Sequence, residues 1–133
     1  MKNRIDYIWL FLKPAGRLTR LPYFLATMLI SVLSSLMVYR RVLVHMPVGA
    51  TDPWQTPGLD QLILLLFIVT LWPMIALSAK RLQDMNVPPF FSVLIAVPMI
   101  SIIGYFILSI YPGTKGPNKY GSVRDMPPPK ARR

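Results

Sequence analysis

Few residues in this chain could do acid–base, nucleophilic or metal chemistry. None of the 133 residues is cysteine or glutamate, so the carboxylates are five aspartates: Asp6, Asp52, Asp60, Asp84 and Asp125. The lack of cysteine excludes disulfides, thiolate metal sites and cysteine nucleophiles. His45 is the only histidine, and without a second metal-binding side chain it is expected to be a solvated loop residue. The sequence therefore predicts no catalytic, metal or cofactor site and no enzymatic activity.

Two basic clusters could bind an anionic group. Arg17 and Arg20 precede Tyr23, and the planar fork of arginine fits phosphate oxygens with two parallel hydrogen bonds. Lys80 and Arg81 form the second cluster, and their long stems can reach phospholipid headgroups. All five residues are therefore candidate contacts for a headgroup or another anion. The alternative is that they only hold membrane helices by general attraction to lipid phosphate, at about 1 kcal/mol each.

Arg81 and Asp84 are three residues apart, which places them on one face of a helix. An exposed pair of this kind contributes little, below about 1 kcal/mol. If it is buried against the region of Arg17 and Arg20, it instead forms a polar clasp that fixes how the helices pack. Both interpretations remain open at this point.

Three uncharged apolar runs must position these residues: 21–39, 62–78 and 90–111, of 19, 17 and 22 residues. A membrane-spanning helix needs about 20 apolar residues. With 53% hydrophobic residues and a mean hydropathy of +0.46, the sequence predicts a single all-α membrane domain over 1–133 with three membrane helices. Multi-pass insertion follows from the same three runs.

Two further segments flank the runs. In 4–13, apolar residues recur at helical spacing opposite polar ones, which predicts a short amphipathic helix lying in the membrane interface. The segment 112–133 holds five prolines, three glycines and six basic residues, and is expected to form a surface tail. Within it, Gly113, Asn118 and Tyr120 predict a compact cap on the helix ends, because glycine allows a tight path and the other two can hydrogen-bond back to it.

Thr27, Ser31 and Ser35 are four residues apart and share one face of the first apolar run. Small hydroxyl residues allow close approach of membrane helices and can hydrogen-bond across the contact, so this face is predicted to pack against another helix. Alternatively, each hydroxyl bonds the carbonyl four residues earlier in its own helix.

A net charge of +10 could indicate nucleic acid as a partner, but the basic residues flank the apolar runs, where anionic headgroups lie. Membrane lipid is therefore the expected partner. Specific nucleic-acid binding is not expected, because the basic tail brings neither a reading element nor stacking aromatics.

The run 90–111 is expected to form one continuous helix, kinked at Pro98, with the N-terminus of the chain in the cytoplasm. The alternative is that this run dips into the membrane and returns. That arrangement would leave only Arg40 and Arg41 of the 15 lysines and arginines outside, as the charge bias of membrane proteins prefers.

Three motifs resemble one family, the small uncharacterised bacterial inner-membrane proteins grouped as domain of unknown function 805 (DUF805). They are Gly16-Arg17-Leu18-Thr19-Arg20 with Tyr23-Phe24, Lys80-Arg81-Leu82-Gln83-Asp84, and the stretch from Pro112-Gly113-Thr114 to Asn118-Lys119-Tyr120-Gly121. Two departures are Gln83, where the family has histidine, and Pro88-Pro89-Phe90-Phe91, where it has a Gly-Trp-Trp type sequence. The resemblance implies the bacterial inner membrane and transfers no catalytic residue.

These observations predict a non-enzymatic membrane subunit or scaffold that packs with copies of itself or with a membrane-protein partner. The alternatives are a small transport or channel component, which would need polar groups along a path through the membrane, and a protein that binds lipid at the headgroup layer. An enzyme acting at that layer, with Asp84 as its carboxylate, ranks below both.

Overall fold

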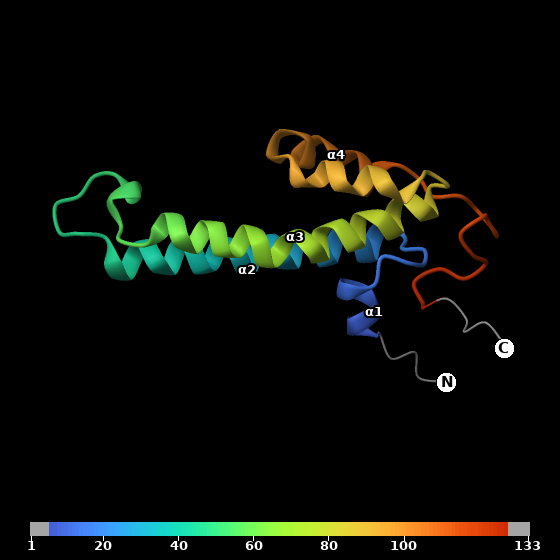
Figure 1. The fold of residues 1–133 in the computed structure, drawn as a ribbon, viewed down its shortest axis with the longest axis horizontal. Coiled ribbons are helices and arrows are strands. Elements are labelled where there is room, and N and C mark those ends of the chain that lie inside the picture. The colour runs from blue at the N-terminus through green and yellow to red at the C-terminus, as the bar shows by residue number, and fades with distance from the viewer. Residues whose placement is uncertain (1–5, 128–133) are drawn as a thin grey trace.

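The computed structural model describes residues 6–127, and within them the regular elements are all helical. Figure 1 shows two long antiparallel helices side by side, with the remaining elements gathered at one end. The elements are α1 (Tyr7–Leu12), α2 (Arg20–His45), η1 (Pro53–Gln55), α3 (Leu59–Asp84), η2 (Pro89–Ala96) and α4 (Pro98–Ile110). We name the two ends by what lies there: the Asp84 end, and the loop end, where residues 46–58 join α2 to α3.

Helices α2 and α3 are long and apolar enough to cross a membrane. Each has 26 residues, about 39 Å at 1.5 Å per residue. Their most apolar windows have mean hydropathies of 1.9 and 2.5, and only 17% and 22% of those windows are buried, whereas the core helix of a soluble protein is mostly buried. Both helices extend beyond the predicted 21–39 and 62–78; the extensions after residues 39 and 78 contain lysine and arginine, which are good helix formers.

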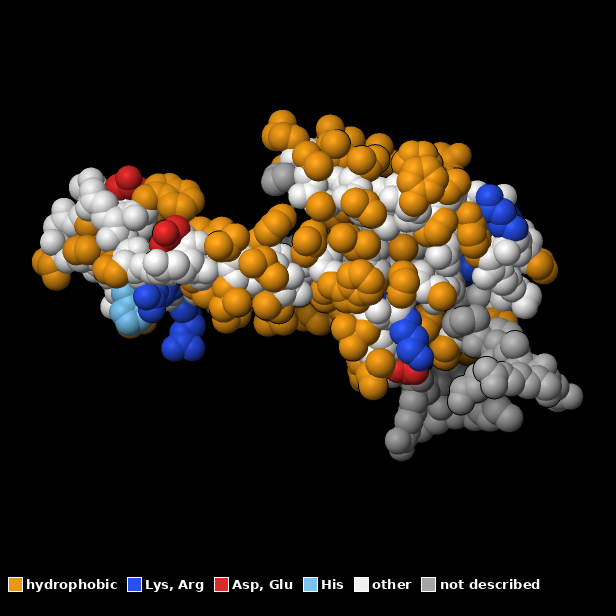
Figure 2. Space-filling model, in the orientation of Figure 1, with side chains coloured by type: hydrophobic (Ala, Val, Ile, Leu, Met, Phe, Trp, Pro, Cys, Tyr) orange, Lys and Arg blue, Asp and Glu red, His pale blue; other side chains and the backbone are white. Residues whose placement is uncertain are grey.

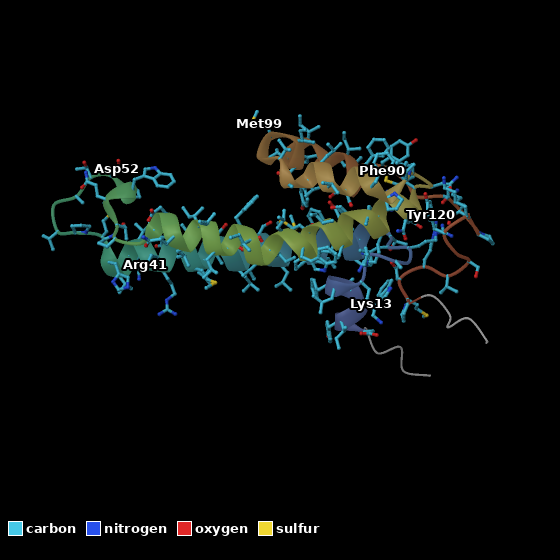
Figure 3. The ribbon with its side chains drawn as sticks, in the orientation of Figure 1. Lys13, Arg41, Asp52, Phe90, Met99 and Tyr120 are labelled. Atoms are coloured by element: carbon cyan, nitrogen blue, oxygen red, sulfur yellow. The ribbon has the colours of Figure 1, made fainter. Side chains whose placement is uncertain are left out.

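The run 90–111 does not form one continuous helix, and that prediction is wrong. The run breaks at Val97, which is extended (φ −89°, ψ 115°) because the proline that follows disfavours helical geometry there. Before the break lies the 3-10 helix η2, and after it the 13-residue α4. The two limbs form a hairpin that lies over the Asp84 half of α3 (Figures 1 and 3), with Phe90 near the Asp84 end and Met99 near the hairpin tip.

The two terminal segments are partly as predicted. Helix α1 has six residues in place of the predicted 4–13, of which residues 4 and 5 lie outside the described part of the chain. It buries Trp9 and exposes Tyr7, Ile8 and Leu12; the amphipathic character predicted for this segment and its placement in a membrane interface stay predictions. The tail contains no regular element over residues 112–127, and residues 128–133 of the predicted 112–133 segment are not described.

The protein core lies at the Asp84 end. All residues from Ala76 to Asp84 are buried. The apolar cluster around them includes residues of α1, α2, α3 and α4 and of the turn before α2: Trp9, Leu18, Tyr23, Ala26, Leu77, Leu82 and Leu108. The loop half of the α2–α3 pair has no such core. Figure 2 shows the face in view with its charged side chains near the two ends and apolar side chains between them.

Candidate functional site

Asp84, the last residue of α3, lies at the centre of a buried ionic cluster. Its carboxylate is 1% exposed and lies within ion-pair distance of three arginines: Arg17 Nη2 at 3.0 Å, Arg81 Nη1 at 2.8 Å and Arg124 Nε at 2.9 Å. We call these four residues the Asp84 cluster. Arg17 comes from the turn before α2 and Arg124 from the tail, so the cluster joins three parts of the chain that are far apart in sequence.

Arg17 holds the tail. Its side chain is fully buried, and its Nε donates to Asp84 Oδ1 at 3.1 Å. The Nη1 group donates to the carbonyls of Gly116 and Gly121, at 2.7 and 2.9 Å, and Nη2 to that of Thr114 at 2.8 Å. All the N–H groups of this guanidinium therefore point at acceptors within the chain.

Arg81 holds the returning end of the hairpin. Its Nε donates to the carbonyl of Leu108 at 2.7 Å and its Nη2 to that of Tyr111, while Nη1 binds Asp84 Oδ2 at 2.8 Å. The last carbonyls of a helix have no partner within it and carry partial negative charge. Arg81 therefore caps the C-terminal end of α4.

Lys80, the neighbouring residue, holds α1 in the same way. Its Nζ donates to the carbonyl of Trp9 at 2.7 Å and to that of Leu10, both in a six-residue helix. The ammonium also lies 4.7 Å from the centre of the Trp9 ring, within the range of a cation–π contact. Two consecutive basic residues of α3 thus bind the carbonyl ends of two different helices.

Gln83 fixes the turn before α2. Its Oε1 accepts from the backbone N–H of Gly16 at 3.0 Å and its Nε2 donates to the carbonyl of Pro14 at 3.1 Å. Its own carbonyl accepts from Asn118 Nδ2 at 2.8 Å. The amide therefore serves as both donor and acceptor, as a peptide group does, and its role here is structural.

The tail motif docks on the end of α3. Thr114 donates to the carbonyl of Asp84 through its N–H at 2.8 Å and through its hydroxyl at 2.5 Å. Asn118 Oδ1 accepts from the N–H of Tyr120 at 2.9 Å, and Asn118 pairs with Gly121 through two backbone hydrogen bonds. Residues 113–121 thus form a compact loop over the helix end.

Asp125 and Arg124 are two functional residues that sequence reasoning missed. Asp125 is exposed, as expected for a solvated tail, and its carboxylate also accepts from the N–H and the hydroxyl of Thr19, at 2.7 and 2.8 Å. Thr19 is the N-cap of α2, where a negative charge is favourable. Nothing in the sequence distinguishes Arg124 from the other basic residues of the tail.

The predicted anion-binding set does not form an exposed site. Arg17, Tyr23, Lys80 and Arg81 are buried, and Arg20 alone of the five is exposed. The long basic side chains turn inward because the carbonyl ends of α1 and α4 and the tail supply acceptors there. Tyr23 Oη lies 3.3 Å from Ser78 Oγ inside the helix bundle.

The predicted packing face of Thr27, Ser31 and Ser35 is buried at one end and exposed at the other. Thr27 is buried and donates to the carbonyl of Tyr23 at 2.8 Å, and Ser31 donates to that of Thr27 at 2.9 Å, which is the alternative considered for these hydroxyls. Ser31 and Ser35 are exposed and do not belong to the core. The face therefore packs within the chain near Thr27 and is uncovered further along α2.

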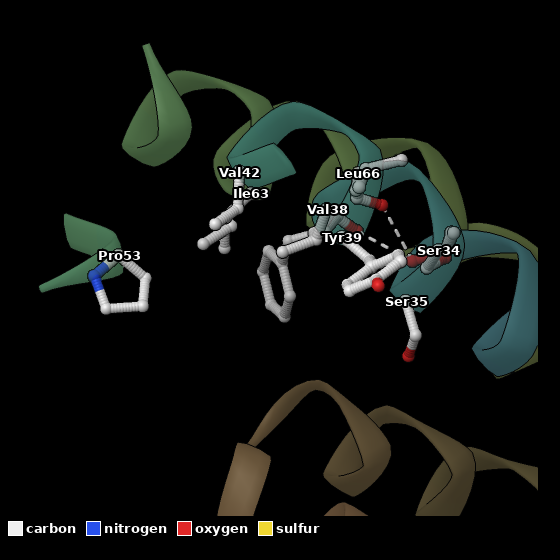
Figure 4. A pocket seen from close by; sticks show the side chains of 10 residues that line it. Ser34, Ser35, Val38, Tyr39, Val42, Pro53, Ile63 and Leu66 are labelled. Carbon is white, nitrogen blue, oxygen red and sulfur yellow. Dashed lines mark hydrogen bonds between the residues drawn. The ribbon is translucent and has the colours of Figure 1, made fainter. Parts of the chain in front are cut away.

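A groove of about 590 Å³ lies between α2 and α3 in their loop half (Figure 4). A second hollow of about 350 Å³ continues it along α2 past Ser31 and shares Ser35 and Tyr39 with it. The groove is lined by apolar and hydroxyl side chains: Ser34, Ser35, Val38, Tyr39, Val42, Pro53, Ile63, Leu66, Phe67 and Thr70. Among residues 6–127, no group of three histidine, cysteine or acidic side chains is arranged to hold a metal ion.

Gly113→Ala should destabilise the protein by about 1–3 kcal/mol, the usual cost of forcing extra volume into a packed site. A Cβ at this position would lie 1.8 Å from Asp84 Oδ2, although the backbone of Gly113 is not left-handed and would itself accept alanine. Gly104→Ala is the matched control, because its Cβ would meet only the flexible tip of Ile95. Unfolding of both variants in detergent measures the difference, and equal stabilities would contradict the close approach at Asp84.

Comparison with known proteins gives one match. The family model described as protein of unknown function (DUF805) matches residues 11–122, which include Arg17, Arg81 and Asp84 but not Arg124. No curated protein and no solved structure matches. Because the match covers most of the chain, the protein belongs to the DUF805 family, whose function is unknown.

Proposed function

We propose that this protein is a non-enzymatic subunit or scaffold of a bacterial inner membrane. The main support for the proposal is that the Asp84 cluster is enclosed by other parts of the chain. Its carboxylate is buried, and the donors of Arg17 and Arg81 are bound to carbonyls and to Asp84 within the chain. The motif residues therefore build the architecture of the protein and offer no open carboxylate to a substrate at the headgroup layer.

The proposed placement has α2 and α3 as two spans, with the Asp84 end on the cytoplasmic side. Thirteen of the 15 lysines and arginines flank the spans on that side, and only Arg40 and Arg41 lie at the loop end. This asymmetry supports the orientation, because cytoplasmic segments carry the excess of basic residues. Both ends of the chain are then cytoplasmic. A transport path is disfavoured, because the charged residues of α2 and α3 lie near the helix ends.

The loop half of the α2–α3 pair is where a partner helix would bind. The hairpin covers the Asp84 half of α3, and the groove beside Ser34 and Ser35 lies beyond it. Small hydroxyl residues allow the backbones of two membrane helices to come close. We assign this groove to a membrane-spanning helix of a second copy or of another protein.

Crosslinking from a single cysteine tests the assignment, and the chain has no native cysteine to interfere. Ser35→Cys should crosslink to a protein partner in native membranes, whereas Leu33→Cys, which is exposed on α2 but outside the groove, should not. The adduct mass distinguishes a second copy from another protein. Equal crosslinking at both positions, or crosslinking to lipid alone, would overturn the assignment.

Ser35→Leu should abolish that association while leaving the folded chain intact. The added bulk fills the groove, but Ser35 is exposed and lies outside the core, so the stability of the isolated chain should change by no more than about 0.5 kcal/mol. Leu33→Phe is the control for added bulk on the same helix. Size-exclusion chromatography in mild detergent and thermal unfolding give the two measurements.

A further inference from the structure

The hairpin of η2 and α4 begins and ends at the same level of the molecule. Thr114, just after α4, donates its N–H to the carbonyl of Asp84 at 2.8 Å, and Arg81 binds the carbonyl of Leu108 at 2.7 Å. Only residues 85–88 separate Asp84 from η2. Figures 1 and 3 show the tip near Met99 pointing along α3 toward the loop end.

The limbs of the hairpin are too short to cross a bilayer. The 13 residues of α4 extend about 20 Å as an α-helix. The eight residues of η2 extend about 16 Å as a 3-10 helix. The hydrocarbon core is about 30 Å thick. A hairpin that starts at the Asp84 end therefore reaches only into the leaflet on that side.

The surface of the hairpin is uncharged and apolar, as a surface in contact with lipid acyl chains should be. Its sequence carries no charge, and large apolar side chains are exposed along both limbs: Phe90, Val93, Met99, Ile103, Phe106 and Ile110. Near the tip, Val97 N–H donates to Leu94 O at 3.1 Å and Ser101 N–H to Val97 O at 2.8 Å, and proline at 98 has no N–H to satisfy. These two bonds satisfy part of the backbone at the tip, as the hydrocarbon region requires of a chain that enters it.

The protein is therefore wider in one leaflet than in the other. Beside the Asp84 half of α2 and α3 lie α1, η2 and α4, whereas no other helix of the described chain except the three-residue η1 lies at the loop half. We propose that the hairpin inserts among the acyl chains of the cytoplasmic leaflet only, and that this wedge shape makes the protein prefer membrane that is convex toward the cytoplasm. A convex leaflet is stretched, so it accommodates the extra cross-section at lower cost. The inference rests on the two-span placement proposed above, and not on the groove.

The depth of the hairpin is measured first. The full chain with a fluorophore on Met99→Cys is placed in vesicles of phosphatidylethanolamine and phosphatidylglycerol that contain lipids spin-labelled at known depths. Met99 should be quenched most by labels deep in the acyl chains, and Lys119→Cys, in the tail, by aqueous iodide. If iodide quenches the fluorophore at position 99 as strongly as the one at position 119, the hairpin is not in lipid and the proposal fails.

Curvature preference is measured on membrane tubes pulled from giant vesicles of the same lipids, with the fluorophore on Lys119→Cys. Dithionite added outside bleaches the fluorophore on protein molecules whose Asp84 end faces outward. The signals of the two orientations are therefore measured separately. Protein with its Asp84 end outside should have a tube-to-vesicle ratio above that of a lipid dye, and protein with that end inside a ratio below it. If the tube-to-vesicle ratio equals that of the lipid dye in both orientations, the proposed curvature preference is refuted. This holds whatever the Ser35 crosslinks show.

A charge on the hairpin supplies a matched variant. Ile103→Lys adds a lysine to the exposed face of α4 and should bring the tube ratio back toward that of the dye, because charge is costly in hydrocarbon. Val48→Lys adds the same charge to the exposed loop at the other end and should leave the ratio unchanged. An unchanged ratio for Ile103→Lys would contradict the proposal. The comparison of tube-to-vesicle ratios between the two orientations uses a chain with an unchanged hairpin. It therefore tests the curvature preference even if Ile103→Lys fails to fold.

Discussion

Asp84→Ala should be the most damaging single substitution in this chain, with a loss of about 3–5 kcal/mol of folding free energy, as expected when one partner of a buried ion pair is removed. The carboxylate is the acidic partner of Arg17 and Arg81, both fully buried, and of the partly exposed Arg124. Without it, Arg17 and Arg81 remain enclosed with only neutral acceptors opposite them, namely backbone carbonyls and the Thr114 hydroxyl. Reversible unfolding by SDS in mixed micelles measures the loss.

Two other aspartates provide a graded comparison. Asp125→Ala removes two hydrogen bonds at the N-terminus of α2 but leaves no buried charge, so a loss of about 0.5–2 kcal/mol is expected, as for other helix caps. Asp60→Ala changes an exposed side chain in the first turn of α3 and should cost no more than about 0.5 kcal/mol. Similar losses for all three variants would show that the Asp84 cluster does not stabilise the fold.

The two long helices could be predicted from sequence because apolar runs of this length have few other outcomes. Runs 21–39 and 62–78 lie inside α2 and α3, and only their ends were predicted too short. The run 90–111 has the same composition and more residues, yet it forms a hairpin. A proline in the middle of such a run is compatible with a kink or a break, and the contacts of Arg81 with Leu108 and Tyr111 favour the break.

The candidate site could be predicted only as a set of residues. Arg81 and Asp84 are neighbours in one helix, so their pairing was a local expectation. The partners of Arg17 lie between 67 and 104 residues away, and four of its acceptors are backbone carbonyls or a hydroxyl of the tail. Backbone carbonyls carry no sequence signal. The inward direction of Arg17 and Lys80 could therefore not be read from residue types, which suggested headgroup contacts instead.

Arg17→Lys should release the tail even though it keeps the positive charge. A lysine has three donors on a single atom and cannot bind Asp84 Oδ1 together with the carbonyls of Gly116, Gly121 and Thr114, which lie around a planar fork. The acceptors left over are partly buried, and each costs about 1–3 kcal/mol when it is unpaired. The undocked loop should then be open to proteases.

Limited proteolysis measures this release. Lys115 and Lys119 are exposed lysines within the docked loop, so trypsin should cleave there faster in Arg17→Lys than in the native chain, while the long helices remain intact. Arg20→Lys is the matched control, because Arg20 lies three residues further on and is exposed. Mass spectrometry of the fragments locates each cut. If Arg17→Lys and Arg20→Lys are cleaved in the tail at the same rate, the tail is held by contacts other than those of Arg17, and the central role of this guanidinium is refuted.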